Sequence, residues 1–443
     1  MKKKIIILSL ISSLAILCLS GCSSEVKQTN KELTVYIGFK EADMKSAVAV
    51  YKQKYPEVNV NVIESKLGDK WDEEAALNEE SSFLSELMSG KGVDVFQMQW
   101  YWDMDKVKES GMLADLSEFY EKDTTFDKEN YNQAVMDSAL YEGKRLYIPL
   151  SYSIPLLLST ESILKKEDFH VENCKDFVSF RKETEKWREH KSLGRKLFRL
   201  GKTTTFNLSA TGYGLVDFHT KRINLDSEEI KDYFRWCKAA LAEDEKDGSN
   251  YIYGGLEGAA ALRDGKIIFE NSLQAYGYGD IVRNCRAINT FDKSVMLPIR
   301  NLEGGVTAMI ESAVGVRGNS VNKQNAYNFI KVLLSDDVQR TPGAQVKGAI
   351  PVSYKVMEDI VYPPTSNTTF GEEINGFPKD CPVFAKEQQE EFMRYTKEVN
   401  KACFLPKWRN KLMEAMQPYF NGEMSYEECI KQAKEQVELY LSE

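Results

Sequence analysis

The stretch 97–103 holds the most unusual concentration of binding chemistry in this sequence. It reads QMQWYWD and places three aromatic side chains in a row, Trp100, Tyr101 and Trp102. A flat aromatic ring stacks on the apolar C–H face of a sugar, while neighbouring amide and carboxylate groups hydrogen-bond its hydroxyls. The stretch therefore favours a platform for a polyhydroxylated ligand. The alternative interpretation is a local aromatic cluster that packs on the next helix.

The elements that precede this stretch are predicted to form a parallel sheet. Three runs of apolar and β-branched residues, 33–39, 58–64 and 93–98, have the character of strands, and the segments 41–55 and 83–89 have helical spacing. The resulting β-α-β-α-β order is typical of a parallel sheet with crossover helices. Such sheets bind ligands beyond the carboxyl ends of their strands. The residues that we expect to bind a ligand at these ends are Phe39, Glu41, Trp71, Gln99, Trp100 and Tyr101.

A second group of aromatic residues lies in a glycine-rich predicted loop at 271–280, after a short predicted strand at 267–269. Gly277 and Gly279 would let the backbone approach a ligand closely, so we expect Tyr276 and Tyr278 to bind the solute. Trp187 and Trp236 lie inside amphipathic helices, and we assign them to the core.

The composition excludes several other classes of function. The 443-residue chain has 58 Lys and Arg against 67 Asp and Glu, a net charge of −9, which argues against a nucleic-acid partner. It has only three histidines and lacks the GxSxG, HExxH, GxGxxG and P-loop motifs, so we expect no enzyme activity, no metal site and no cofactor. The many carboxylates leave a glycoside hydrolase as a minor alternative.

The N-terminus has the layout of a secretory signal. Three lysines after Met1 precede an apolar run of about 15 residues, too short to span a bilayer, and Leu19-Ser20-Gly21-Cys22 follows. Residues 19–22 resemble a bacterial lipobox, in which the cysteine is acylated. We therefore expect a signal peptide over 1–21, lipid on Cys22, and a polar tether over 22–31. This places the protein on the extracytoplasmic face of the cell membrane. Whether the six later cysteines form disulfides is left open.

Several weak motifs occur in an order that resembles one family. The resemblance covers about residues 32–441 and is to the extracellular solute-binding proteins of ABC importers, in the maltose-binding-like family 1 group. The motifs are GKRLYIP at 143–149, the small-residue helix at 258–265, the amphipathic helix at 325–339, GAIPV at 348–352, and NGEMSYEE at 421–428.

The resemblance implies an α/β fold of two lobes with a hinge between them, the type II periplasmic-binding-protein fold. The first lobe would comprise 32–150 and 292–342, and the second 151–291 and 343–443. Tyr152, beside the predicted crossover, and Trp408, on the helix before Gly422, are the remaining residues expected to bind the ligand. For Trp408, simple helix packing is an equal alternative.

The function that the resemblance implies is capture of a solute, most simply a carbohydrate or oligosaccharide, by a monomer that delivers it to the transmembrane subunits of an ABC permease. Two alternatives remain open. One is an importer component for a solute other than a sugar. The other is a surface adhesin or sensor partner built on the same fold.

Overall fold

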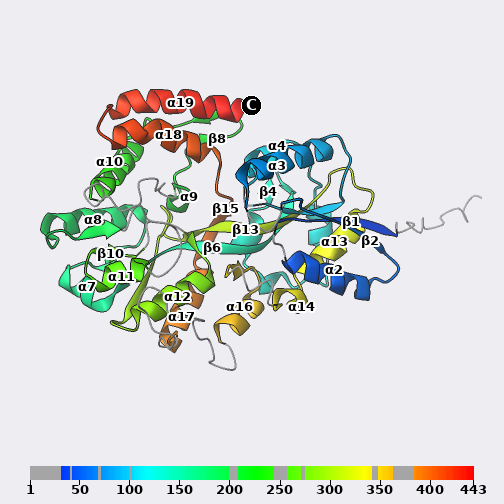
Figure 1. Ribbon diagram of the computed structural model, residues 1–443, viewed down its shortest axis with the longest axis horizontal. Helices are drawn as coiled ribbons and strands as arrows, with labels where there is room; N and C mark the ends of the chain where they lie inside the picture. Colours follow the sequence, from blue (N-terminus) through cyan, green and yellow to red (C-terminus); the bar gives the residue numbers. More distant parts are fainter. Residues whose placement is uncertain are drawn as a thin grey trace, which may run out of the picture.

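Figure 1 shows the computed structural model of the chain, which describes residues 31–39, 42–67, 71–99, 101–198, 208–243, 257–270, 275–341, 348–362 and 384–443. The described strands form one large mixed sheet of nine, in which six follow the order β11-β6-β13-β3-β1-β2, and three small two-stranded sheets. Helices cover both faces of the large sheet (Figure 1).

The first part of the sheet is the parallel unit that the sequence predicts. β1 (Glu32–Ile37) pairs in parallel with β2 (Asn59–Glu64) and with β3 (Val95–Met98), and the connections contain α2 (Ala42–Lys54) and α3 (Glu73–Met88). The prediction of a β-α-β-α-β unit is therefore confirmed. The carboxyl ends of β1 and β3 lie side by side, which sets the positions of the residues that follow them.

Two long strands connect the two halves of the molecule. β6 (Tyr147–Thr160) and β13 (Val306–Val316) are antiparallel and run across the middle of Figure 1. β13 pairs with β3 at one end and with β15 (Val399–Cys403) at the other. The sequence predicts a proline-interrupted segment here, but β6 continues through Pro149 and Pro155. Pro155 lacks an N–H, yet its carbonyl still accepts a hydrogen bond from Ile299 N at 2.9 Å.

One further strand pairs with the far end of β6. β12 (Ser294–Pro298) pairs with 156–160, in the second half of the molecule. The division of the chain into 32–150 with 292–342 and 151–291 with 343–443 stays a prediction. The segments 150–155 of β6 and 310–312 of β13, which we call the crossing segment, lie between the two halves and contain two register shifts, on either side of Ser312.

The remaining elements are short strands and the helices that cover the sheet. The strands are β4 (Leu140–Tyr141), β5 (Lys144–Arg145), β7 (Lys196–Phe198), β8 (Val216–Asp217), β9 (Arg222–Ile223), β10 (Ile267–Phe269), β11 (Ala275–Tyr276) and β14 (Ile350–Pro351). The helices are α4 (Met104–Glu109), α5 (Ser117–Lys122), α6 (Gln133–Asp137), α7 (Glu161–Lys166), α8 (Phe177–His190), α9 (Leu208–Thr211), α10 (Glu228–Ala242), α11 (Glu257–Arg263), α12 (Tyr278–Ile288), α13 (Lys323–Leu333), α14 (Asp336–Gln339), α16 (Tyr354–Val361), α17 (Lys386–Lys397), α18 (Trp408–Phe420) and α19 (Tyr426–Ser442), with 3-10 turns η1 (Lys128–Asn130) and η2 (Val171–Asn173).

The described apolar residues gather into two cores. One surrounds the large sheet and extends through the crossing segment, because it includes Leu33 of β1 as well as Phe392 of α17. The other lies inside the second half, where Trp187 and Trp236 are buried as predicted.

Three sequence predictions of secondary structure are corrected by the structure. The many charges of 164–190 predict one helix that is mostly solvated, but α7 and α8 are separate and α8 buries six residues, including Arg181 and Glu183. The predicted helix at 325–339 is divided into α13 and α14. Within the predicted loop at 271–280, β11 contains Tyr276, and Tyr278 begins α12. Local polarity does not reveal these breaks, which depend on tertiary packing.

None of the helices in the described ranges is long and apolar enough to cross a bilayer. The cysteines that the structure describes, Cys174, Cys237, Cys285, Cys403 and Cys429, are all free thiols. Cys381 and the lipobox residue Cys22 lie outside the described residues.

Candidate ligand-binding site

Three of the predicted aromatic residues lie together where strands of the first half end. Phe39 follows β1, Trp71 lies just before α3, and Tyr101 follows β3. The ring centroids of Phe39 and Trp71 are 5.8 Å apart, and those of Trp71 and Tyr101 are 5.1 Å apart, both in edge-to-face geometry. We call these three residues the aromatic edge. Trp71 is 40% exposed and Tyr101 only 5%, so Trp71 offers more ring surface to a ligand.

Gln99 lies directly against the end of β1. A Cβ atom at Gly38 would lie 1.9 Å from Gln99 Nε2, so only a glycine leaves room for this side chain. Gln99 Nε2 donates a hydrogen bond to the carbonyl of Gln97 at 3.3 Å. Gln99 is therefore at the predicted edge of the sheet, but it is 2% exposed and packed beside the aromatic edge.

The crossing segment contributes two polar residues that the sequence analysis missed. Ser153 Oγ, on β6, donates a hydrogen bond to Glu311 Oε1, on β13, at 2.5 Å. Glu311 is the one exposed residue in β13, whose other ten residues are buried. Next to it, Gln97 Nε2 donates to Ser312 Oγ at 2.7 Å, which connects the crossing segment to the end of β3. The sequence feature that could have pointed to Glu311 is its place as the one acidic residue inside the apolar run VTAMIESAVGV. Charged residues are rare in such strands unless they are paired or functional.

The second half contributes Tyr276. β11 pairs with β6 at Ile154, next to Ser153, so Tyr276 lies near the crossing segment. Its hydroxyl donates to the Glu270 carboxylate, 3.2 Å from each oxygen. Burial, and then the charge of Glu270, raise the pKa of Tyr276, so the phenol stays protonated and remains a donor.

Two other predicted tyrosines have packing partners in the protein. Tyr152 is 1% exposed, and its hydroxyl accepts a hydrogen bond from Asn132 Nδ2 at 3.5 Å. The ring of Tyr278 packs on that of Phe392, with centroids 5.0 Å apart. The structure therefore gives both residues a structural role, and contact with a solute stays a prediction for each.

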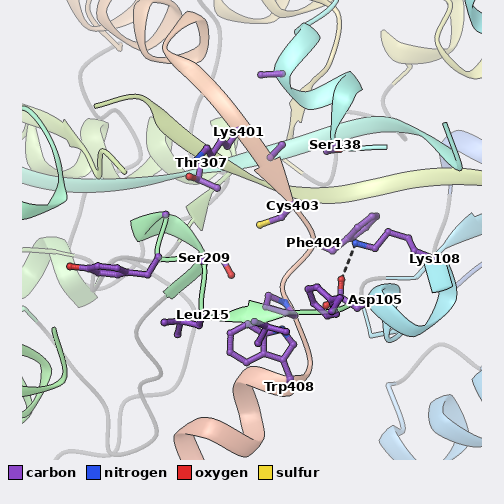
Figure 2. Close-up of a pocket in the computed structure, with 18 of the residues that line it drawn as sticks. Asp105, Lys108, Ser138, Ser209, Leu215, Thr307, Lys401, Cys403, Phe404 and Trp408 are labelled. Atoms are coloured by element: carbon purple, nitrogen blue, oxygen red, sulfur yellow. Dashed lines mark ion pairs between the residues drawn. The ribbon is translucent and has the colours of Figure 1, made fainter. Parts of the chain in front are cut away.

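Trp408 lies at a separate place between the two halves. It is the first residue of α18, is 8% exposed, and lines a cavity of about 570 Å³ (Figure 2). The first half contributes to this cavity the ion pair of Asp105 and Lys108, 2.9 Å apart, from α4. The second half contributes Ser209 and Leu215, and β15 passes along the cavity to Trp408 (Figure 2). Trp408 thus lies between the halves, with no ring contact to the aromatic edge among the described residues, and its contact with a solute stays a prediction.

The lysine before Trp408 faces acidic residues of the first half. Burial lowers the pKa of Lys407, and the charges of Glu80 and Asp103 oppose that shift. Glu80 and Asp103 belong to the α3 and α4 region, which also positions Trp71 and Tyr101. The start of α18 is therefore attracted electrostatically to the part of the first half that contains the aromatic edge.

Two predicted ligand residues, Glu41 and Trp100, lie outside the described residues. No three His, Cys, Asp or Glu side chains gather as metal ligands in the part of the chain that the structure describes. The side chains at the ends of β1 and β3, in the crossing segment and on β11 include rings, amides, hydroxyls and carboxylates. They can stack on and hydrogen-bond a neutral solute.

Comparison with solved structures places this architecture in a known group. The sugar-binding protein MalE from Xanthomonas citri matches with a TM-score of 0.65 at 13% sequence identity, over 93% of this chain and 97% of that one. A family 1 extracellular solute-binding protein from Alicyclobacillus acidocaldarius matches with a TM-score of 0.62 at 15% identity, over 94% and 100% of the two chains. The chain has the two-lobed fold of the maltose-binding-like, family 1 solute-binding proteins.

A third match is the ABC substrate-binding protein from Listeria monocytogenes in complex with cycloalternan, with a TM-score of 0.58 at 13% identity, over 93% of this chain and 99% of that one. No protein-family model matches the sequence, and no curated protein matches it. At sequence identities of 13–15%, the similarity of the structures, and not of the sequences, shows the solute-binding fold. The two halves described above are therefore the two lobes of this fold.

Proposed function

We propose that this protein captures a carbohydrate or oligosaccharide between its two lobes and delivers it to an ABC importer. The observation that carries the proposal is the position of candidate binding side chains in the crossing segment and on the strands beside it. The aromatic edge lies at the ends of β1 and β3 in the first lobe, Tyr276 of β11 pairs with β6 in the second, and the Ser153–Glu311 hydrogen bond joins β6 to β13. Each lobe then supplies part of a site that neither completes alone.

The fold comparisons support the choice of solute. Among the matched proteins, one is described as a sugar-binding protein, one as a substrate-binding protein in complex with cycloalternan, and one, from Synechococcus, as a putative oligosaccharide periplasmic-binding protein. Stacking rings beside hydrogen-bonding amides, hydroxyls and carboxylates suit the same class of ligand. We therefore place a binding role ahead of a hydrolytic one.

Lobe closure is the mechanism that we propose for capture. The two register shifts in the crossing segment support it, since bulges bend strands and weaken local pairing. A ligand that contacts both lobes stabilises the arrangement in which both sets of contacts are made. The permease subunits would then bind that arrangement of a monomeric protein.

The decisive test is a thermal-shift screen of the mature protein against neutral and acidic oligosaccharides, amino acids and peptides. A ligand at a hundredfold excess over its Kd stabilises the folded state by about 2.7 kcal/mol, a readily measured shift in Tm. Stabilisation by an oligosaccharide alone would support the proposal. Stabilisation by an amino acid or peptide alone would favour the importer of a different solute, and no stabilisation by any compound would favour the adhesin or sensor role.

We also propose that Cys22 anchors the protein to the extracytoplasmic face of the membrane through lipid. The motive is the lipobox-like Leu19-Ser20-Gly21-Cys22 at the end of an apolar run. Detergent partitioning and mass spectrometry of the mature N-terminus test this. We expect Cys22→Ala to leave the protein without lipid, with the signal uncleaved or the product shed, and a mature parent chain that begins at a residue other than Cys22 would contradict the proposal. Cys429→Ala, which removes a buried thiol, is the matched control.

A further inference from the structure

Glu311 is unusual because it is an acidic residue placed at the centre of a buried strand. Ile310 pairs with Tyr152, and Ser312 pairs with Ser151, so Glu311 is the extra residue of a bulge. A bulge redirects a side chain that would otherwise follow the alternation of the strand. Here it leaves Glu311 exposed while every other residue of β13 is buried. The backbone thus presents this carboxylate at the surface of the crossing segment.

The carboxylate is also held in position. Ser153, itself 1% exposed, donates its hydroxyl hydrogen bond to one oxygen of Glu311 at 2.5 Å. Ser153 and Glu311 come from the two strands that connect the lobes. A hydrogen bond between them orients the carboxylate before a ligand arrives, which reduces the entropy that binding would otherwise cost.

The strands on both sides of β6 carry hydrogen-bonding groups. Ser312 accepts from Gln97, and the register of β13 with β3 places the end of β3, with Gln99, beside the bulge. On the second lobe, β11 pairs with β6 at Ile154, and Tyr276 of β11 donates to the Glu270 carboxylate. β13, which carries Glu311, and β11, which carries Tyr276, therefore lie on opposite edges of β6.

We infer that Glu311 is a specificity-determining residue that selects uncharged polyhydroxyl units over carbohydrates that carry carboxylate or sulfate groups. This inference rests on the proposed function. An ionised carboxylate only accepts hydrogen bonds, so a sugar hydroxyl pairs with it favourably, and charge-assisted bonds of this kind are stronger than neutral ones. An anionic substituent at the same place would face like charge from Glu311, which costs affinity.

The experiment compares the parent protein with Glu311→Gln by calorimetry. The probes are the neutral trisaccharides maltotriose, cellotriose and xylotriose, and the acidic trigalacturonate. We expect Glu311→Gln to weaken binding of the preferred neutral sugar about tenfold to a hundredfold, because a charge-assisted hydrogen bond is lost. The same variant should bind trigalacturonate more tightly than the parent does. Glu435→Gln on α19, an exposed residue, removes the same charge away from the crossing segment and should leave both affinities unchanged.

The outcomes separate this inference from the proposed function. If a neutral sugar binds and Glu311→Gln leaves its affinity unchanged, the inference is wrong while carbohydrate capture stands. A parent protein that prefers trigalacturonate would overturn it in the same way. If none of the four probes binds the parent, both the carbohydrate ligand and the inference are contradicted. If Glu311→Gln does not fold, Glu311→Asp, which keeps the charge, takes its place in the experiment. Glu311→Asp should retain the preference for neutral over acidic sugars.

Discussion

Gly38 and Gln99 show how closely the ends of β1 and β3 approach one another beside the aromatic edge. Because a Cβ at Gly38 would overlap the Gln99 amide, we expect Gly38→Ala to push this side chain away and disturb the neighbouring rings. Gly38→Ala should weaken solute binding about tenfold or more, with a stability loss of about 1–3 kcal/mol from the overlap.

Calorimetry and urea denaturation measure the two effects of Gly38→Ala. Gly143→Ala is the control, since a Cβ there meets nothing within 4 Å, although its φ of +77° makes that substitution strained as well. It should therefore cost stability without affecting affinity. Unchanged solute affinity in a folded Gly38→Ala protein would mean that Gln99 and the aromatic edge are not part of the site.

The rings themselves give a second prediction at the scale of residues. Replacing one stacking ring with alanine should cost about 1–3 kcal/mol of binding free energy, or about tenfold to a hundredfold in Kd. We expect Trp71→Ala to lose affinity with little loss of stability, because Trp71 is 40% exposed. Tyr101→Ala and Tyr276→Ala should lose both, because these rings also pack in the protein.

Calorimetry with the identified solute decides this prediction. Tyr362→Ala, on an exposed ring after α16, is the matched control. If Trp71→Ala, Tyr101→Ala and Tyr276→Ala all bind as tightly as the parent, the solute is held elsewhere. The cavity beside Trp408 would then be the next place to examine.

Residue order determines which residues follow a strand, so the residues at the ends of β1 and β3 could be predicted from the sequence. That reasoning placed Phe39, Trp71 and Tyr101 in one group, as the structure has them. It could not reveal Ser153 and Glu311, since their proximity depends on the register between β6 and β13, which are far apart in the chain. Nor could it show that Tyr152 is buried by the strands on both sides of it.

At the scale of elements, α19 shows a local signal that the structure confirms. Ser425 followed three residues later by Glu428 predicts a capping box at the start of this helix. The Ser425 side chain accepts from Glu428 N, and the Glu428 carboxylate accepts from Ser425 N at 2.9 Å, as this prediction requires. Ser425 Oγ also donates to Glu428 Oε2 at 2.7 Å, and this bond, together with the one from Ser425 N, holds the pKa of Glu428 below its usual value. Such reciprocal bonds involve residues three apart, so the sequence alone was sufficient to predict them.

We expect Ser425→Ala to lower the free energy of unfolding by about 1 kcal/mol, because the first turn of α19 loses its cap. Ser442→Ala, at the other end of the same helix, is the control and should change little. Urea denaturation followed by circular dichroism measures both. Equal midpoints for Ser425→Ala and the parent would show that α19 is held by its packing on α18 rather than by its cap.

Longer-range features of the elements were harder to predict. The charged segment 164–190 looked solvated, yet Glu183 of α8 is buried and accepts from His170 N at 3.0 Å and from Asn173 at 3.1 Å. Residue type alone does not show whether a charged side chain is hydrogen-bonded by another segment of the protein or exposed to water. The apolar periodicity of α10 and α13, in contrast, correctly identified their buried faces.

At the scale of the whole molecule, one side of the two lobes is bridged by contacts to α4. The Tyr440 hydroxyl, on α19, hydrogen-bonds the Asp103 carboxylate, and Lys106 Nζ lies 4.3 Å from the Tyr440 ring centroid. Lys221, between β8 and β9, forms an ion pair with Glu109. These contacts link the second lobe to the helix that follows the aromatic edge.

Removing these bridges should loosen the two lobes. We expect the double variant Tyr440→Ala and Lys221→Ala to have a larger radius of gyration without ligand than the parent, measured by small-angle scattering. The parent should expand in the same direction at high salt, since the Lys221–Glu109 pair is partly exposed and is screened.

Lys231→Ala is the control for this double variant, because its ion pair with Glu427 joins α10 and α19 within one lobe. Its scattering should match that of the parent. Identical profiles for the double variant and the parent would show that the crossing segment alone sets the lobe arrangement. Saturating ligand should restore the compact form of the double variant, because the solute contacts both lobes.

The position of β13 also has a consequence for how the chain folds. This strand lies between β3 and β6 in the sheet, although it follows both of them by a long stretch of chain, and β15 joins it later still. The sheet of the first lobe therefore lacks a central strand until most of the polypeptide has been synthesised. Pairings between distant segments form slowly, because the connecting loop must first close. A nascent chain that cannot complete its sheet early stays unfolded for longer, and an unfolded chain is the form that passes through a narrow secretion pore.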